Sequence, residues 1–277
     1  MIVALALLTG LAALAPLTRR LMPLRASGPT TASPGAGRDD LADAAAGFEL
    51  GVLLEQRGDL AGALAAYRRG DERGDPDSAF NLGALLVKRG DLAEALAAFR
   101  RADERGDAGG ASNLGLLLEE RGDIAGALTA YRRADARGDA DGAFNLGGLL
   151  AERGDLAGAI AAFRRADERG HSGGASSLGL LLEGRGDLAG ALAAYRRADD
   201  RGDADGAFNL GALLAEYGDL ERAEAAYCHA IERGDSEVAE KARAALKKLH
   251  QSDSDEQAAG PRGSGSPRKL NLASRRS

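Results

Sequence analysis

Residues Asp75–Gly106 read DPDSAFNLGALLVKRGDLAEALAAFRRADERG, and the stretch that follows, Asp107–Gly138, repeats the same pattern as DAGGASNLGLLLEERGDIAGALTAYRRADARG. A Leu-Gly pair recurs at this constant step through the chain, with its glycines at Gly51, Gly83, Gly115, Gly147, Gly179 and Gly211. An aromatic residue recurs at the same step, at Tyr67, Phe99, Tyr131, Phe163, Tyr195 and Tyr227. A fixed period of this length indicates a repeat architecture.

Each repeat unit consists of two blocks of equal length, and most blocks end in Arg-Gly-Asp, as at Arg89-Gly90-Asp91. The glycine can adopt the left-handed conformation that ends a helix, and the aspartate can cap the helix that follows. Asp91 and Glu94 have the spacing of a capping box. Connections this short make consecutive helices pack antiparallel. We therefore expect twelve helices of about 14 residues between Asp40 and Arg233.

The apolar residues support helices rather than strands. Leu82, Leu85 and Leu86 share one helical face, and so do Leu92, Leu96 and their neighbours in the following block. The glycine of each Leu-Gly pair lies in mid-helix, where it costs about 1 kcal/mol relative to alanine. Its recurrence six times predicts a close approach between helices.

Several of these residues resemble a known repeat family. The run Asn81-Leu82-Gly83, followed by Leu86, Gly90, Ala95, Phe99 and Ala102, resembles the tetratricopeptide repeat, and Ser78–Gly83 is similar to the related Sel1-like repeat. The resemblance covers about 210 residues in six units. The unit, which runs from Asp75 to Gly106 in the stretch quoted above, is shorter than is usual in either family. Ala79 stands where tetratricopeptide repeats often have Trp, and no Pro closes the second helix.

The resemblance implies an all-α fold, a right-handed solenoid of six antiparallel helix hairpins with a C-terminal capping helix over Ser236–His250. The repeat domain would span residues 39–250, between an apolar segment with a flexible linker (1–38) and a disordered basic tail (251–277). The resemblance also implies an adaptor that holds a peptide or protein segment in its concave groove. No particular partner is indicated, and the oligomeric state stays open.

One row of side chains is a candidate for contact with such a ligand. Asparagine precedes the Leu-Gly pair in four units, and phenylalanine precedes the asparagine in three of them. The candidate ligand-binding residues are Asn81, Asn113, Asn145, Asn209, Phe80, Phe144 and Phe208. An amide offers both a donor and an acceptor to a peptide backbone. The alternative is intramolecular: the amides bond neighbouring helices, and the rings pack between helices.

Paired arginines such as Arg100-Arg101 recur in the second helix of each unit. Asp103 and Glu104 follow at three and four residues, which is the spacing of ion pairs within one helix. We interpret these arginines as a solvated, internally paired face rather than as an anion-binding site. The Arg-Gly-Asp triplets are explained by helix ends, so we do not interpret them as adhesion motifs.

The sequence favours a non-enzymatic protein without a metal or cofactor. Its single cysteine, Cys228, is adjacent to His229, and adjacent helical residues point about 100° apart. The net charge is −6, and residues 1–38 contain four arginines and no acid. The acidic charge therefore lies in the repeats, and this argues against nucleic-acid binding. An enzyme subunit or hydrolase with an unrecognised site and a purely structural spacer remain as alternatives.

The N-terminal residues Ile2–Leu17 (IVALALLTGLAALAPL) contain no charge, and Arg19 and Arg20 follow them. Sixteen residues are few for a bilayer span. Positive charge after the apolar run favours a short membrane anchor with the repeats in the cytoplasm. Export after cleavage of a signal peptide is the alternative.

Overall fold

The described part of the chain consists of α-helices joined by short turns, without a strand. A computed structural model gives the backbone of residues 38–259 and the side chains of residues 45–251. The described residues divide into two compact units, 38–153 and 154–259. We treat each by itself. The N-terminal segment and the tail beyond Ala259, which the sequence assigned to an anchor, a linker and a disordered region, lie outside the described residues.

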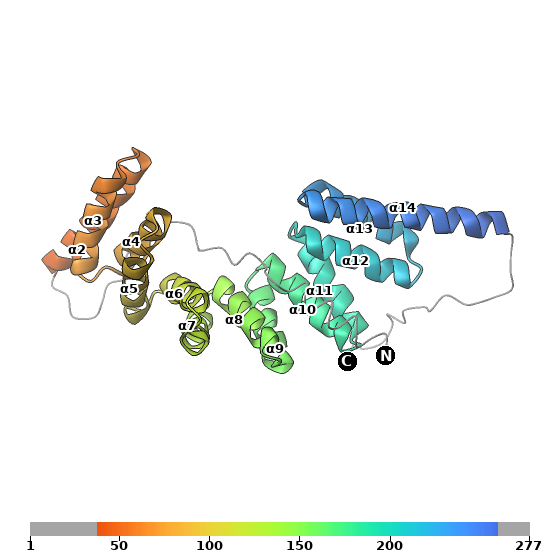
Figure 1. Ribbon diagram of the computed structural model, residues 1–277, viewed down its shortest axis with the longest axis horizontal. Helices are drawn as coiled ribbons and strands as arrows, with labels where there is room; N and C mark the ends of the chain where they lie inside the picture. Colours follow the sequence, from red (N-terminus) through yellow and green to blue (C-terminus); the bar gives the residue numbers. More distant parts are fainter. Residues whose placement is uncertain (1–37, 260–277) are drawn as a thin grey trace. The chain divides into compact units, whose positions relative to one another are not determined.

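The first compact unit contains seven helices (Figure 1). They are α2 (Arg38–Gln56), α3 (Leu60–Glu72), α4 (Pro76–Arg89), α5 (Leu92–Glu104), α6 (Ala108–Glu120), α7 (Ile124–Ala136) and α8 (Ala140–Glu152). Each helix packs against the next along the chain. The first helices of successive repeats, α2, α4, α6 and α8, also contact one another. This unit is therefore a stack of hairpins with one layer of first helices and one of second helices.

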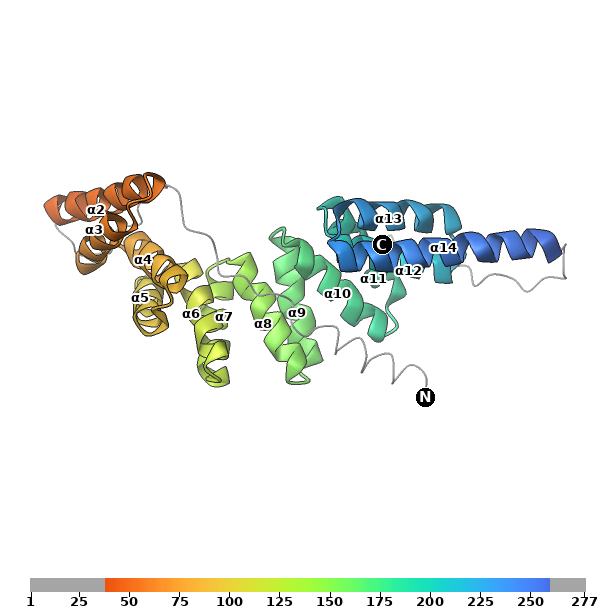
Figure 2. The same cartoon turned by 45° about the horizontal axis from the view of Figure 1, so that its top comes forward.

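The second compact unit contains six helices, seen from a second direction in Figure 2. They are α9 (Leu156–Glu168), α10 (Ser172–Gly184), α11 (Leu188–Asp200), α12 (Ala204–Glu216), α13 (Leu220–Arg233) and α14 (Ser236–Ala259). Again each helix packs on the next, and α10, α12 and α14 contact at alternate positions. The predicted all-α hairpin repeat is confirmed. Five of the six expected hairpins lie within one or other compact unit.

The turns have the predicted geometry. Eleven regularly spaced glycines, one at the end of each block from Gly58 to Gly218, have positive φ, as at Gly90 with φ 90°. Most of the following aspartates accept a hydrogen bond from a backbone N–H three residues on, as Asp75 does from Ser78 at 2.7 Å. The prediction of a capping box at Asp91 is wrong. Asp91 makes no capping bond and instead accepts from Arg89, while Glu94 accepts from Arg68 at 2.7 Å.

Glycines of the Leu-Gly series contact aromatic residues of the other repeating series. A Cβ added to Gly83 would lie 2.7 Å from the Phe99 ring, and one added to Gly115 would lie 2.5 Å from the Tyr131 ring. Glycine at these positions lets the ring approach the backbone of the first helix more closely than any side chain would allow. The predicted close approach is therefore between a helix backbone and the aromatic ring of its own hairpin partner.

The C-terminal helix covers the last hairpin. α14 packs on α13 and α12, with Ala239 and Ala242 buried. Its outer side carries charged residues such as Glu240, Lys241 and Lys248. The predicted capping helix is thus present, but its predicted end at His250 is wrong, because the helix continues to Ala259.

Candidate functional site

The asparagine row lies mostly inside the protein. Asn81 and Asn113 are 0% exposed and Asn145 is 3% exposed, whereas Asn209 is half-buried. The Asn81 amide donates to the hydroxyl of Tyr67 on α3 at 3.3 Å. Three of the four amides therefore do not face an open groove in this structure, and Asn81 fits the intramolecular alternative. That this row binds a ligand stays a prediction, and its accessible member is Asn209.

The phenylalanines next to this row also pack within the protein. Phe80 is fully buried, with its ring centroid 5.9 Å from that of Phe99. Phe208 is half-buried and lies 5.8 Å from the ring of Tyr227, while Phe144 is 9% exposed. The intramolecular reading fits Phe80 fully. Phe208 combines a packing contact with some accessible surface.

Three tyrosine hydroxyls make a hydrogen bond that the sequence analysis missed. Tyr67, Tyr131 and Tyr195 donate to a glutamate twelve residues earlier, on the first helix of the same hairpin. The bonds are Tyr67–Glu55 at 3.2 Å, Tyr131–Glu119 at 2.8 Å and Tyr195–Glu183 at 2.7 Å. Burial, followed by the charge of the glutamate, raises the pKa of Tyr67 and Tyr195 above the usual tyrosine range. These hydroxyls are therefore structural donors at neutral pH.

The units with phenylalanine in place of tyrosine lack the glutamate as well. Phe99 and Phe163 belong to units in which Val87 and Ala151 occupy the glutamate position. The constant spacing of twelve residues was the available signal for this pairing.

The arginine pairs have a different partner from the predicted one. Arg101 on α5 donates from Nε to the buried Asp71 on α3 at 2.9 Å, and Arg105 donates to the same carboxylate at 2.5 Å. The prediction of ion pairs within one helix is wrong, because the acceptor belongs to the preceding repeat. Internal pairing is confirmed for the second arginine of the pair, Arg101, whereas Arg100 lines the groove described below.

The same arrangement recurs in both compact units, and we call it the Asp–Arg ladder. Asp103 binds Arg133 and Arg137, Asp167 binds Arg197 and Arg201, and Asp199 binds His229 and Arg233. Burial tends to raise the pKa of Asp167, but the hydrogen bonds and charges of Arg197 and Arg201 outweigh it and lower that pKa. These arginines connect successive second helices through ion pairs. His229 contacts Asp199 rather than Cys228.

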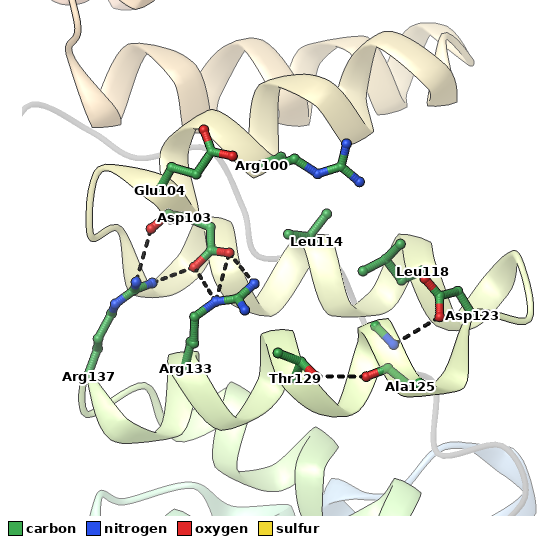
Figure 3. Close-up of a pocket in the computed structure, with 11 residues that line it drawn as sticks. Arg100, Asp103, Glu104, Leu114, Leu118, Asp123, Ala125, Thr129, Arg133 and Arg137 are labelled. Carbon is green, nitrogen blue, oxygen red and sulfur yellow. Dashed lines mark hydrogen bonds and ion pairs between the residues drawn. The ribbon is translucent and has the colours of Figure 1, made fainter.

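An open groove lies between α5 and α7, over α6 (Figure 3). Its cavity volume is about 690 Å³. Leu114 and Leu118 of α6 lie between the two second helices, while Arg100 and Glu104 extend from α5 on one side. On the other side Thr129 donates to the Ala125 carbonyl at 2.9 Å, and Arg133 is held by Asp103. The groove therefore has apolar residues within a rim of both charges.

A metal-binding cluster and a membrane-spanning helix are both absent from the described residues. In residues 38–259, no group of three or more His, Cys, Asp or Glu is arranged to hold a metal ion. Over the same residues, none of the helices combines the length and the apolar character that crossing a bilayer requires.

A model of the tetratricopeptide repeat matches three consecutive stretches of the chain, residues 36–79, 71–111 and 112–174, which together span half of it. The chain belongs to the tetratricopeptide repeat family. Members of this family generally act as scaffolds that bind proteins or peptides. In this tetratricopeptide repeat protein the Asp–Arg ladder and the glycine–aromatic contacts hold the scaffold together.

Two solved structures resemble this tetratricopeptide repeat chain over most of its length. A Sel1 repeat protein from Oxalobacter formigenes is 22% identical, with a TM-score of 0.59 over 75% of this chain and 99% of that one. PilF of Pseudomonas aeruginosa is 18% identical, with a TM-score of 0.60 over 75% and 99%. At these identities the likeness shows the fold. No curated protein matches the sequence at a significant level.

Proposed function

We propose that the repeat region is a protein-interaction scaffold, and that the groove between α5 and α7 receives a segment of the partner. Family membership supports the general role. The groove supports the location, because it offers the half-buried Leu118 to an apolar side chain, over the buried Leu114 and beside the exposed Arg100 and Glu104. An apolar centre with a polar rim is the usual anatomy of a protein-binding surface.

The rim also indicates the chemistry of the bound segment. Asp103 holds Arg133 and Arg137, so their positions are fixed before a ligand arrives. Arg100 and Glu104 lie one helical turn apart on the opposite side and present both signs of charge. A segment with one large apolar residue flanked by an acidic and a basic residue would complement this surface.

Selection from a displayed random-peptide library against the full chain tests the proposal. Leu118→Arg places a charge on the apolar part of the groove, and Leu60→Arg changes an exposed leucine of α3 outside it. We expect selected peptides to lose at least about tenfold in affinity for Leu118→Arg, or about 1.4 kcal/mol, and less than twofold for Leu60→Arg. Failure to select any peptide would favour the structural-spacer alternative. Equal binding by both variants would move the site away from this groove.

A further inference from the structure

The first helix of the array exposes a face that every later repeat buries. Leu50 and Leu53 of α2 are 40% and 50% exposed. The five equivalents of Leu50 are 1–5% exposed and those of Leu53 are 2–6% exposed. These are Leu82, Leu114, Leu146, Leu178 and Leu210, and Leu85, Leu117, Leu149, Leu181 and Leu213. Ala46 and Glu49 of α2 are exposed as well. We call these four residues the α2 edge.

The later repeats show what normally covers this face. It packs against the second helix of the preceding repeat, as α4 packs on α3 and α6 on α5. The fit is close and involves small residues. A Cβ on Gly110 would lie 2.6 Å from the Ala102 Cβ, and one on Gly206 would lie 2.3 Å from that of Ala198. A segment that covers the α2 edge therefore needs large apolar side chains against Leu50 and Leu53, and small residues beside Ala46.

The last hairpin is finished differently from the first. α14 follows α13 and turns a charged outer side to solvent, including Glu240 and Lys241. A polar outer face is what the end of a repeat array requires for solubility. No described helix has this role at the α2 edge, and an apolar face of this kind marks a contact site.

The chain's own preceding residues have the composition that such a cover needs. Ile2–Leu17 contains six Leu, five Ala and one Gly, and no charge. Sixteen residues equal one block of the repeat and would span about 24 Å as a helix, comparable with the 19-residue α2. The twenty residues that join this segment to α2 can extend over about 60 Å, so they do not restrict its position. The tether also gives the segment a high effective concentration at the edge.

We propose that Ile2–Leu17 packs across the α2 edge, covering Ala46, Leu50 and Leu53 in place of the missing second helix. This occupant is favoured over a second copy because it supplies the small residues that the interior contacts use. It competes with the membrane anchor expected from the sequence, since the same residues cannot cover α2 and enter a bilayer at once.

Hydrogen exchange on the full chain in detergent-free buffer tests this inference. Amides of residues 2–17 should exchange at least tenfold more slowly than in a free peptide of the same sequence. The Leu50→Lys/Leu53→Lys variant should restore peptide-like rates. Leu92→Lys, at a leucine that is 41% exposed on α5, is the matched control and should leave the protection unchanged. Circular dichroism melting establishes that both variants stay folded, as expected for exposed positions.

Three outcomes would overturn the proposal. Peptide-like exchange of residues 2–17 in the unmodified chain would show that the segment does not dock. Protection that survives Leu50→Lys/Leu53→Lys, with the chain sedimenting on phosphatidylcholine–phosphatidylglycerol vesicles, would assign the segment to the membrane. A doubled mass by light scattering that Leu50→Lys/Leu53→Lys abolishes, without protection of residues 2–17, would assign the edge to a second copy of the chain.

Discussion

Arg101 reaches back thirty residues to the buried carboxylate of Asp71, so its charge joins two repeats rather than two turns of one helix. The neighbouring Arg100 extends into the groove instead. Two adjacent and chemically identical side chains thus have different roles: one holds the scaffold together and the other lines an open surface.

Replacing these two arginines one at a time should separate the roles. Arg101→Ala removes charge-assisted hydrogen bonds to a buried carboxylate and should lower the free energy of unfolding by about 1–2 kcal/mol. The expected loss is small for an ion pair because the Arg101 side chain is 38% exposed and solvent screens its charge. Arg100→Ala should change stability by less than about 0.5 kcal/mol. Urea denaturation measures both, and equal losses would contradict the assignment.

The asparagine row gives a second pair of variants. Asn81→Ala removes the donor to Tyr67 from a buried site and should destabilise the chain by about 1–3 kcal/mol. Asn209→Ala changes a half-buried residue and should have a smaller effect. A large loss of partner affinity at unchanged melting temperature for Asn81→Ala would restore the predicted ligand contact.

The tyrosine–glutamate bond can be tested against the chain's own alternative. Tyr131→Phe removes the hydroxyl that donates to Glu119 and should lower stability by about 1 kcal/mol. Adding Glu119→Val reproduces the Phe99–Val87 combination of the preceding unit and should recover most of that loss. A double-mutant cycle measured by thermal denaturation gives the coupling. Additive effects would show that the two residues act independently.

Gly83→Ala tests the glycine–aromatic contact by the sign of its effect. In an unobstructed helix, alanine is more stable than glycine by up to about 1 kcal/mol. Here the new Cβ would lie 2.7 Å from the Phe99 ring, so we expect destabilisation by about 1–3 kcal/mol. In a Phe99→Leu background, which lacks the ring, Gly83→Ala should cost less stability than it does in the unmodified chain. Stabilisation by Gly83→Ala alone would contradict the close contact.

Asp139 makes stability depend on pH. Burial, with nearby Asp141 and Asp107, raises its pKa from 3.8 to about 6 against a hydrogen bond from Gly142. The folded chain therefore binds more protons than the unfolded chain between about pH 4 and pH 6, and its stability falls as the pH rises through that range. The loss of stability caused by ionising the buried Asp139 is complete above about pH 6 and absent below about pH 4.

Asp139→Asn removes this penalty and keeps a capping side chain. It should stabilise the protein at pH 7.5 by about 1–2 kcal/mol and change little at pH 4. Asp123→Asn, at an exposed cap that accepts from Gly126 at 2.9 Å, is the control and should change stability only slightly at either pH. An equal effect of Asp139→Asn at both pH values would rule out this origin.

The sequence predicted local structure better than it predicted partners. Periodicity and turn chemistry located the hairpins because both act over a few residues. The Asp71–Arg101 pair was missed because packing between repeats, not helical spacing, brings the two residues together. Adjacent residues on a helix point about 100° apart, so the apolar neighbour Leu82 does not reveal whether other helices also cover Asn81. For this reason the asparagines were predicted to face a groove. The length of α14 was underestimated because residues after His250 are polar and carry no apolar period.

The ladder also bears on how the gene can change length. The ladder contacts at Asp71, Asp103 and Asp167 each join one aspartate to two arginines of the next repeat, and cassettes two repeat units apart resemble each other in sequence. Unequal crossing-over between such cassettes would keep the reading frame and regenerate the same ion pairs at the new junction. The last repeat cannot take part on equal terms, because Ile231 occupies the place of the ladder aspartate and His229 that of the first arginine. We therefore expect repeats to be gained and lost in the interior of the array, so that the number of units varies among alleles while the last repeat stays constant.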